Sequence, residues 1–127
     1  MRKKNINLWE ARELSEKFCE DFNIDYCEVY YVDRVKDCVG VYIWLDQPHI
    51  LIQESYQNKI CLVMHELIHH LDSQKYSTMI LNHSTRGYLN AKKRVVTWCK
   101  KNISSKPDWN KGLKANHIEK EMKEFQL

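Results

Sequence analysis

Residues 59–74 read KICLVMHELIHHLDSQ, and this stretch decides how the whole chain is interpreted. Its apolar residues recur at the spacing of an α-helix, and His65 and His69 lie four residues apart with Glu66 beside the first. Positions i and i+4 of a helix face the same way, so both imidazoles can bind one ion. Glu66 lies about 100° further round, which suits a contact with bound water instead of the ion. The stretch predicts an H-E-x-x-H metal site, with zinc as the expected ion.

The competing interpretation is an ordinary core helix without metal. An apolar face is present in either case, formed by Ile60, Met64, Leu67 and Leu71. Burying two imidazoles and a carboxylate beside a core costs free energy unless each of them has a partner. We therefore favour the metal site.

A zinc site needs a third protein ligand, and a catalytic one keeps water in the fourth position. His83 is the favoured candidate, because it follows a connection long enough to turn the chain back and precedes a later basic helix. Asp72 is the rival, although a carboxylate there more often holds a ligand histidine by a hydrogen bond. His70 points away from the face that carries His65 and His69, so it is expected on the surface or behind a ligand.

The hydrophobic period changes along the chain and gives the order of the other elements. Helical spacing predicts a helix in residues 7–22, with Asn7 as its N-cap and Glu10 completing a capping box. β-branched and aromatic residues predict three strands, in 26–32, 38–45 and 49–54, which we expect to form a meander. A last helix is predicted in 86–102. The expected fold class is α+β.

Composition and charge limit the remaining possibilities. The 127 residues suit one domain, with a core in 1–103 and with 104–127 as a linker and short helical tail. No apolar run approaches the roughly 18 residues of a membrane span, so no membrane partner is expected. The N-terminus lacks the apolar run of a signal peptide, which favours a cytoplasmic location. The five cysteines form no C-x-x-C pair and are expected to be packed thiols.

The sequence resembles the SprT-like zinc metallopeptidases, the group that includes Spartan. The resemblance covers residues 7–102 and rests on HELIH at 65–69 and HSTRGY at 83–88. It implies a zincin-like fold in which His65, His69 and His83 bind zinc.

The same resemblance implies that Glu66 is the catalytic base.

Two features depart from the family pattern. Ser84 stands where the family usually has a glycine, and the aromatic Tyr88 comes five residues after His83 instead of four. The chain also lacks the C-terminal cysteine ribbon that many bacterial members carry.

These features predict a zinc-dependent metalloendopeptidase that hydrolyses peptide bonds through a zinc-activated water, with Glu66 as general base. Tyr88 is the first candidate for a donor to the tetrahedral oxyanion, and Tyr76 and Arg86 are alternatives. Tyr88 fits a core position about equally well. The expected substrate is an extended protein segment, added as a strand to an exposed edge of the sheet at 41–45 or 50–53.

A basic stripe on the last predicted helix makes DNA a candidate partner, and thereby DNA-associated proteins candidate substrates. Its residues are Arg86, Lys93 and Lys100. We prefer a solvated helix face, because the net charge of the chain is only +3. DNA binding would weaken steeply with salt.

The alternative function is an inactive or latent zincin-fold binding module, for DNA or for a protein, with a structural or inhibited zinc site. A residue of the tail, His117 or Glu119, is a candidate to occupy the open position of such a site. Glu66 favours the enzyme, because a purely structural site needs no base beside its ligands.

Overall fold

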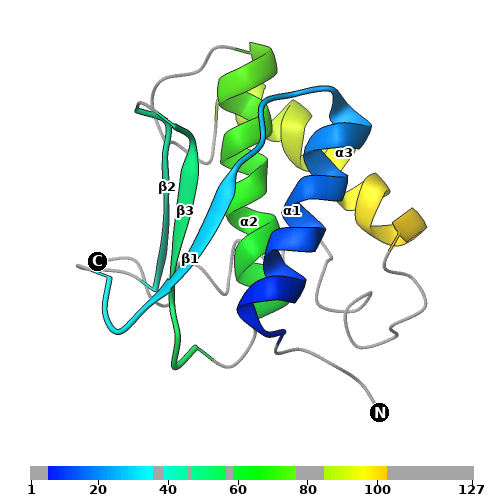
Figure 1. Cartoon of the computed structure of the whole chain (residues 1–127). Helices are drawn as coiled ribbons and strands as arrows, with labels where there is room; N and C mark the ends of the chain where they lie inside the picture. The colour runs from blue at the N-terminus through cyan, green and yellow to red at the C-terminus, as the bar shows by residue number, and fades with distance from the viewer. Residues whose placement is uncertain (1–5, 36–38, 46, 57–58, 77–84, 103–127) are drawn as a thin grey trace.

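The computed structural model of the chain describes residues 6–35, 39–45, 47–56, 59–76 and 85–102. They form three α-helices, a short π-helix and one mixed sheet, which confirms the α+β class (Figure 1). Their order is α1 (Leu8–Phe22), β1 (Glu28–Val32), β2 (Gly40–Ile43), β3 (His49–Gln53), α2 (Lys59–Leu71), the π-helix η1 (Asp72–Tyr76) and α3 (Arg86–Asn102). The predicted tail, 104–127, lies outside the described residues.

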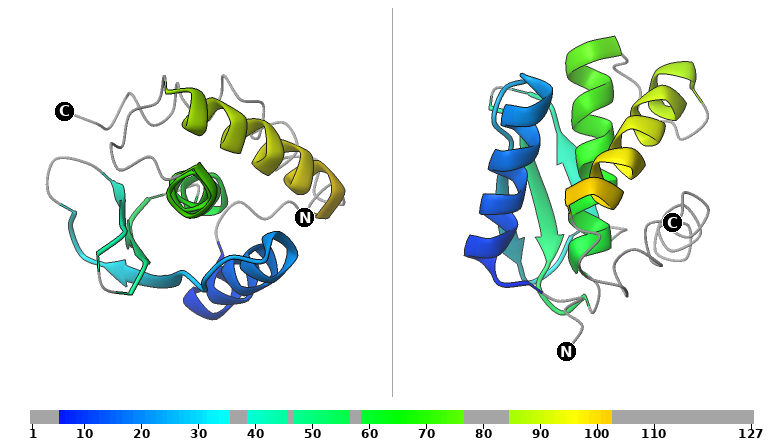
Figure 2. Two further views of the ribbon diagram at one scale, coloured as in Figure 1. Left: turned by 90° about the horizontal axis from the view of Figure 1, so that it is seen from above. Right: turned by 90° about the vertical axis from the view of Figure 1, so that its right-hand side faces the viewer.

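Helix α2 lies at the centre of the fold. Figure 2 shows it end-on, with the sheet on one side and α1 and α3 packed around the rest. Every residue from Lys59 to Leu71 is buried. A helix that is apolar around most of its circumference is stable only when it is covered on all sides, and this arrangement provides that cover. No helix in the described part of the chain is long and apolar enough to cross a membrane.

Helix α1 begins at the predicted capping box. The Glu10 amide donates to Asn7 Oδ1 over 2.8 Å, and the Asn7 amide donates to Glu10 Oε1 over 2.9 Å. The two bonds satisfy amides that have no partner within the helix. At the other end, Asn23 adopts a left-handed conformation with φ of 54°, which closes the last turn.

The strand order is β1-β3-β2, so the predicted meander is wrong. β3 is the central strand, parallel to β1 and antiparallel to β2. Its Ile50 and Ile52 are fully buried, which suits a strand that is paired on both sides. The connection from β1 to β2 has seven residues, 33–39. This length is enough to pass the position of β3, since neighbouring strands lie roughly 5 Å apart, whereas a meander would need only a tight turn.

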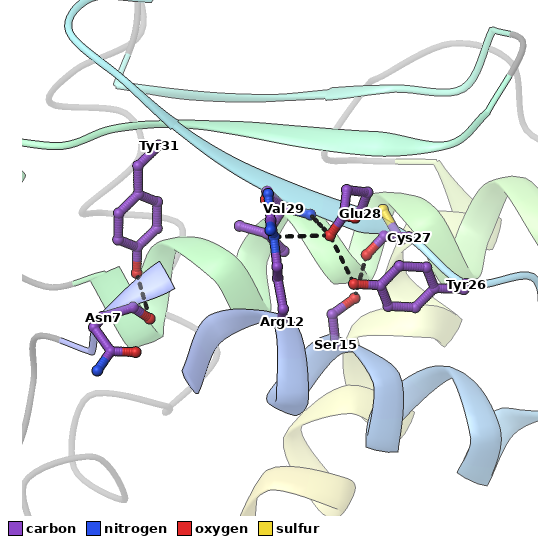
Figure 3. A network of polar contacts seen from close by, with 8 residues as sticks. All are labelled: Asn7, Arg12, Ser15, Tyr26, Cys27, Glu28, Val29 and Tyr31. Carbon is purple, nitrogen blue, oxygen red and sulfur yellow. Dashed lines mark hydrogen bonds and ion pairs between the residues drawn. The ribbon is translucent and has the colours of Figure 1, made fainter. Parts of the chain in front are cut away.

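The outer edge of β1 is closed by side chains of α1 (Figure 3). Arg12 Nε donates to the carbonyl of Val29 over 2.9 Å, and Ser15 Oγ donates to the carbonyl of Cys27 over 2.6 Å. The Arg12 guanidinium also pairs with Glu28 at 3.0 Å. These bonds occupy the carbonyl of Val29 in β1 and that of Cys27 just before it, which an added strand would otherwise use.

The core joins the inner face of the sheet to α2. Gly40 allows a close approach of β2 to α2, because a Cβ atom there would lie 2.8 Å from Leu62 Cδ1. Four cysteines are buried free thiols, Cys19, Cys27, Cys61 and Cys99. The prediction of packed thiols is confirmed for these four, and Cys38 lies outside the described residues.

Candidate functional site

Helix α2 presents His65 and His69 together on the side that faces α3. Their ring centres are 5.1 Å apart, and the ring planes are nearly perpendicular. Two imidazoles on one tetrahedral zinc, with Zn–N bonds of about 2.0–2.1 Å, would have their ring centres about 5 Å apart. The spacing of the two rings therefore fits shared binding of one ion.

Helix α3 brings Tyr88 to the same place. Its ring centre lies 5.1 Å from that of His69 and 6.3 Å from that of His65. The side chain is fully buried and belongs to the hydrophobic core. The core position of Tyr88 is therefore confirmed, and its role as a donor to the oxyanion stays a prediction.

Glu66 is buried beside the histidines. Burial raises the pKa of its carboxyl group to about 8, because the charged form loses its hydration. Its Oε2 has no hydrogen-bond partner among the residues that the structure describes. A carboxyl group whose pKa lies near neutrality can both accept and return a proton, as a general base must. A nearby cation would lower that pKa.

Lys92 is the residue of this site that the sequence analysis missed. It lies one turn after Tyr88 on α3, is only 8% exposed, and has its Nζ 5.6 Å from the centre of the Tyr88 ring. Its position four residues after Tyr88 places both on one side of the helix, and this spacing was the available signal. The abundance of other cations on α3 concealed it.

His70 points away from the side that carries His65 and His69, as predicted, but it is buried and not on the surface. Its Nδ1 lies 2.8 Å from the Tyr42 hydroxyl, and its Nε2 lies 2.6 Å from the carbonyl oxygen of Asp25. A carbonyl only accepts, so Nε2 carries the proton and Nδ1 accepts from Tyr42. Burial lowers the pKa of His70 and favours this neutral form. The sheet covers this side of α2, which explains the burial.

The third ligand remains a prediction, because His83 lies outside the described residues. Asp72 is buried in η1 directly after α2. Within the described ranges, no three His, Cys, Asp or Glu side chains form a group that could hold a metal ion. Asp72 is therefore not placed with His65 and His69 as a third ligand in this structure.

The other predicted residues lie outside this cluster. Arg86, Lys93 and Lys100 are all exposed on α3, which suits both a solvated face and a nucleic-acid contact. Tyr76 is partly exposed in η1. No ring or hydrogen-bond contact that the structure describes joins Tyr76 or Arg86 to the two histidines, whereas Tyr88 contacts both.

The two predicted substrate edges have different outcomes. Residues 50–53 belong to β3, which is paired on both sides, so the expectation that they form an edge is wrong. Residues 41–43 belong to β2, which pairs only with β3 in the part of the sheet that the structure describes. β2 also packs against α2. This edge remains the candidate position for an added strand.

Comparisons of the chain with known protein families, with curated proteins and with solved structures find no match. The interpretation of the site therefore depends on its own residues and their geometry.

Proposed function

We propose that the chain is a zinc-dependent metalloendopeptidase of the SprT-like type, with a zincin-like fold. The observation that carries this proposal is the paired arrangement of His65 and His69, whose ring centres are 5.1 Å apart on one side of a buried helix. Glu66 beside them supplies a base, and a structural zinc site would not need one.

The residues that would hold the ion are His65, His69 and His83. Zinc in such a site lowers the pKa of a bound water and polarises a peptide carbonyl. The chain's own acid–base group is Glu66, which takes a proton from the attacking water and passes it to the leaving amine. Burial raises the pKa of this carboxyl group, and a cation bound by the histidines would lower it again, which favours the ionised form that accepts the proton.

Tyr88 has two roles in this proposal. Its ring packs on His69 and limits the movement of that imidazole. Its hydroxyl group is the candidate donor to the oxyanion of the tetrahedral intermediate, a charge that buried donors stabilise strongly.

The substrate would be an extended protein segment at the outer edge of β2. The edge of β1 is less suitable, because Arg12 already occupies the carbonyl of Val29 and Ser15 that of Cys27, just before the strand. Proteins on DNA are a substrate class within this proposal, with Arg86, Lys93 and Lys100 as the candidate contacts to phosphate. Their exposure on one helix supports it.

A latent or inactive binding module is the second candidate, and one observation favours it. His65, Glu66, His69 and Tyr88 are each at most 4% exposed. A substrate must reach the base, so this closed arrangement is expected of a form that opens before it acts.

The first experiment measures zinc content and casein digestion for the wild type and three variants. We expect about one zinc per chain in the wild type, loss of zinc in His69→Ala, and retained zinc with digestion reduced by about 10²-fold or more in Glu66→Gln. His49→Ala is the matched control, because His49 lies on β3 and contacts Tyr30 and Gln47 instead of the site.

The latent form is tested by truncation after Ser105. The latent form would be favoured if the wild type binds zinc but digests casein only after the tail is removed. A wild type that binds no added zinc would contradict both forms of the proposal.

A further inference from the structure

The ammonium group of Lys92 lies in an unusual place for a lysine. The side chain is 8% exposed, although lysines are rarely buried without a partner. Neighbouring cations of α3 such as Lys93 and Arg94 are exposed. The fold thus buries one cation of α3 and leaves others exposed to water. Burial costs Lys92 part of its hydration free energy, and this loss requires a compensating interaction.

The Tyr88 ring provides such an interaction. Lys92 Nζ lies 5.6 Å from the ring centre, within the range in which a cation is attracted by the negative face of an aromatic ring. This attraction is stronger when the cation is shielded from water, as it is here. The aliphatic part of the side chain adds apolar contact, so charge and packing have to be separated experimentally.

The same ring contacts the two histidines. Tyr88 lies 5.1 Å from His69 and 6.3 Å from His65, measured between ring centres. Tyr88 is therefore the link between the buried ammonium group and the imidazole pair. A change in the attraction on Tyr88 would change the position of its ring against His69.

We propose that Lys92 is a positioning residue, which holds the Tyr88 ring against His69 and thereby fixes the orientation of that imidazole. The consequence for zinc affinity rests on the function proposed above, whereas the effect on Tyr88 and His69 does not. Residues that orient metal ligands from behind typically change metal affinity by about 10–100-fold when they are replaced. The expected effect of Lys92 is at the lower end of this range, because it acts through Tyr88.

The decisive measurement is the NMR chemical shift of the His69 ring protons in the metal-free protein, with EDTA present. The ring current of Tyr88 changes the chemical shifts of the nearby His69 ring protons. The variant Tyr88→Leu gives the chemical shifts of these protons in the absence of that ring current. In Lys92→Met, which keeps the length of the side chain but not its charge, we expect the shifts to move most of the way to that value. Lys92→Arg restores the charge and should stay near the wild type.

Lys93→Met is the matched control. It removes one positive charge from the same helix. Lys93, however, is exposed and lines a surface pocket together with Phe22 and Trp98. We expect its His69 shifts to equal those of the wild type. Lys92→Gln is a second neutral variant in case Lys92→Met does not fold, and far-UV circular dichroism checks folding of each protein.

Two results would overturn the proposal. Wild-type His69 shifts in a folded Lys92→Met or Lys92→Gln protein would show that the cation does not hold the ring. Equal shifts in Lys92→Arg and Lys92→Met would assign the effect to packing by lysine itself and not to charge.

Zinc affinity, measured by competition with a chelator, extends the test to the site. We expect about tenfold weaker binding in Lys92→Met and a change below about threefold in Lys92→Arg and Lys93→Met. If the wild type binds no zinc, the proposed function fails, while the metal-free NMR result still decides the role of Lys92. Unchanged zinc affinity in Lys92→Met would remove the consequence for the metal site.

Discussion

The two sides of α2 both carry histidine, but the contacts of these histidines differ in kind. On the side of the sheet, both ring nitrogens of His70 are in hydrogen bonds, one with Tyr42 and one with Asp25. On the side of α3, His65 and His69 contact each other and Tyr88 through their rings. At His70, Nδ1 uses its lone pair to accept from Tyr42 and Nε2 carries a proton, so neither nitrogen is available to a metal, whereas a ring contact by itself uses no lone pair.

Adjacent residues, His69 and His70, therefore have opposite expected roles. The first is suited to bind an ion, and the second joins α2 to β2 and to the connection between α1 and β1. About 100° of rotation along the helix separates these roles. The comparison predicts that metal acts on one side of α2 only, and that stability without metal depends more on the other.

The largest expected effect is the stabilisation by zinc. At a free zinc concentration about 1,000 times the dissociation constant, binding raises the free energy of unfolding by about 4 kcal/mol. Replacing His69 by Ala should abolish this gain, whereas His70→Gln should keep it on a lower baseline. Urea unfolding with zinc and with EDTA measures both. An equal gain in His69→Ala and the wild type would break the comparison.

Next in size is the loss of stability in His70→Leu. This change removes both hydrogen bonds of the buried His70 ring, with the Tyr42 hydroxyl and with the Asp25 carbonyl, which should lower the free energy of unfolding by about 3 kcal/mol. The loss should be the same with and without zinc. His69→Leu in EDTA is the matched variant on the other side and should lose less. The reverse order would contradict the assignment of His70 as the structural histidine.

The close packing between β2 and α2 predicts a smaller effect. In Gly40→Ala, the new methyl group would lie 2.8 Å from Leu62 Cδ1, so the leucine side chain must shift. We expect a loss of about 2 kcal/mol in the free energy of unfolding, with unchanged zinc affinity. Combining it with Leu62→Ala should give less than the sum of the two single losses, because the methyl group then has space. Full additivity would show that the contact does not limit the approach.

The smallest expected effect concerns the Tyr42 hydroxyl. In Tyr42→Phe, His70 Nδ1 loses its donor, and the free energy of unfolding should fall by about 1 kcal/mol. In a His70→Leu background the same change should cost clearly less, since the hydrogen bond to His70 is already absent. A cost of about 1 kcal/mol in both backgrounds would mean that Tyr42 acts independently of His70.

The sequence predicted the helices well because helical periodicity and capping are local. The capping box at Asn7 and Glu10 forms as expected, and α3 covers the predicted 86–102. Strand order was not predictable in the same way. Alternation shows which side of a strand is buried, but not which strand lies beside it. The burial of Ile50 and Ile52 in a strand paired on both sides depends on residues far away in the chain.

The candidate site divides along the same line. The pairing of His65 and His69 follows from the spacing within one helix, and Tyr88 was expected from its place after the motif. The burial of His70 was not predictable, because it depends on what covers that side of α2. For Lys92 the only sequence signal was its spacing from Tyr88. Tyr42, which contacts His70, lies on β2, far from α2 in the sequence.

The buried cysteines have a consequence for following the motions of this protein. Burial raises the pKa of Cys19 to about 11, and it also raises the pKa of Cys27 and Cys99. Only the thiolate reacts with alkylating reagents, so at pH 7 the folded protein presents roughly one reactive Cys19 in ten thousand. Labelling therefore has to wait for an opening of the structure.

These thiols lie at two different contacts. Cys19 and Cys27 are where α1 meets the start of β1, and Cys61 and Cys99 are on α2 and α3. Alkylation followed residue by residue in a mass spectrometer would time the separation of each contact with natural probes alone. The order in which these cysteines are alkylated would show which contact opens first, that between α1 and β1 or that between α2 and α3, without an engineered probe.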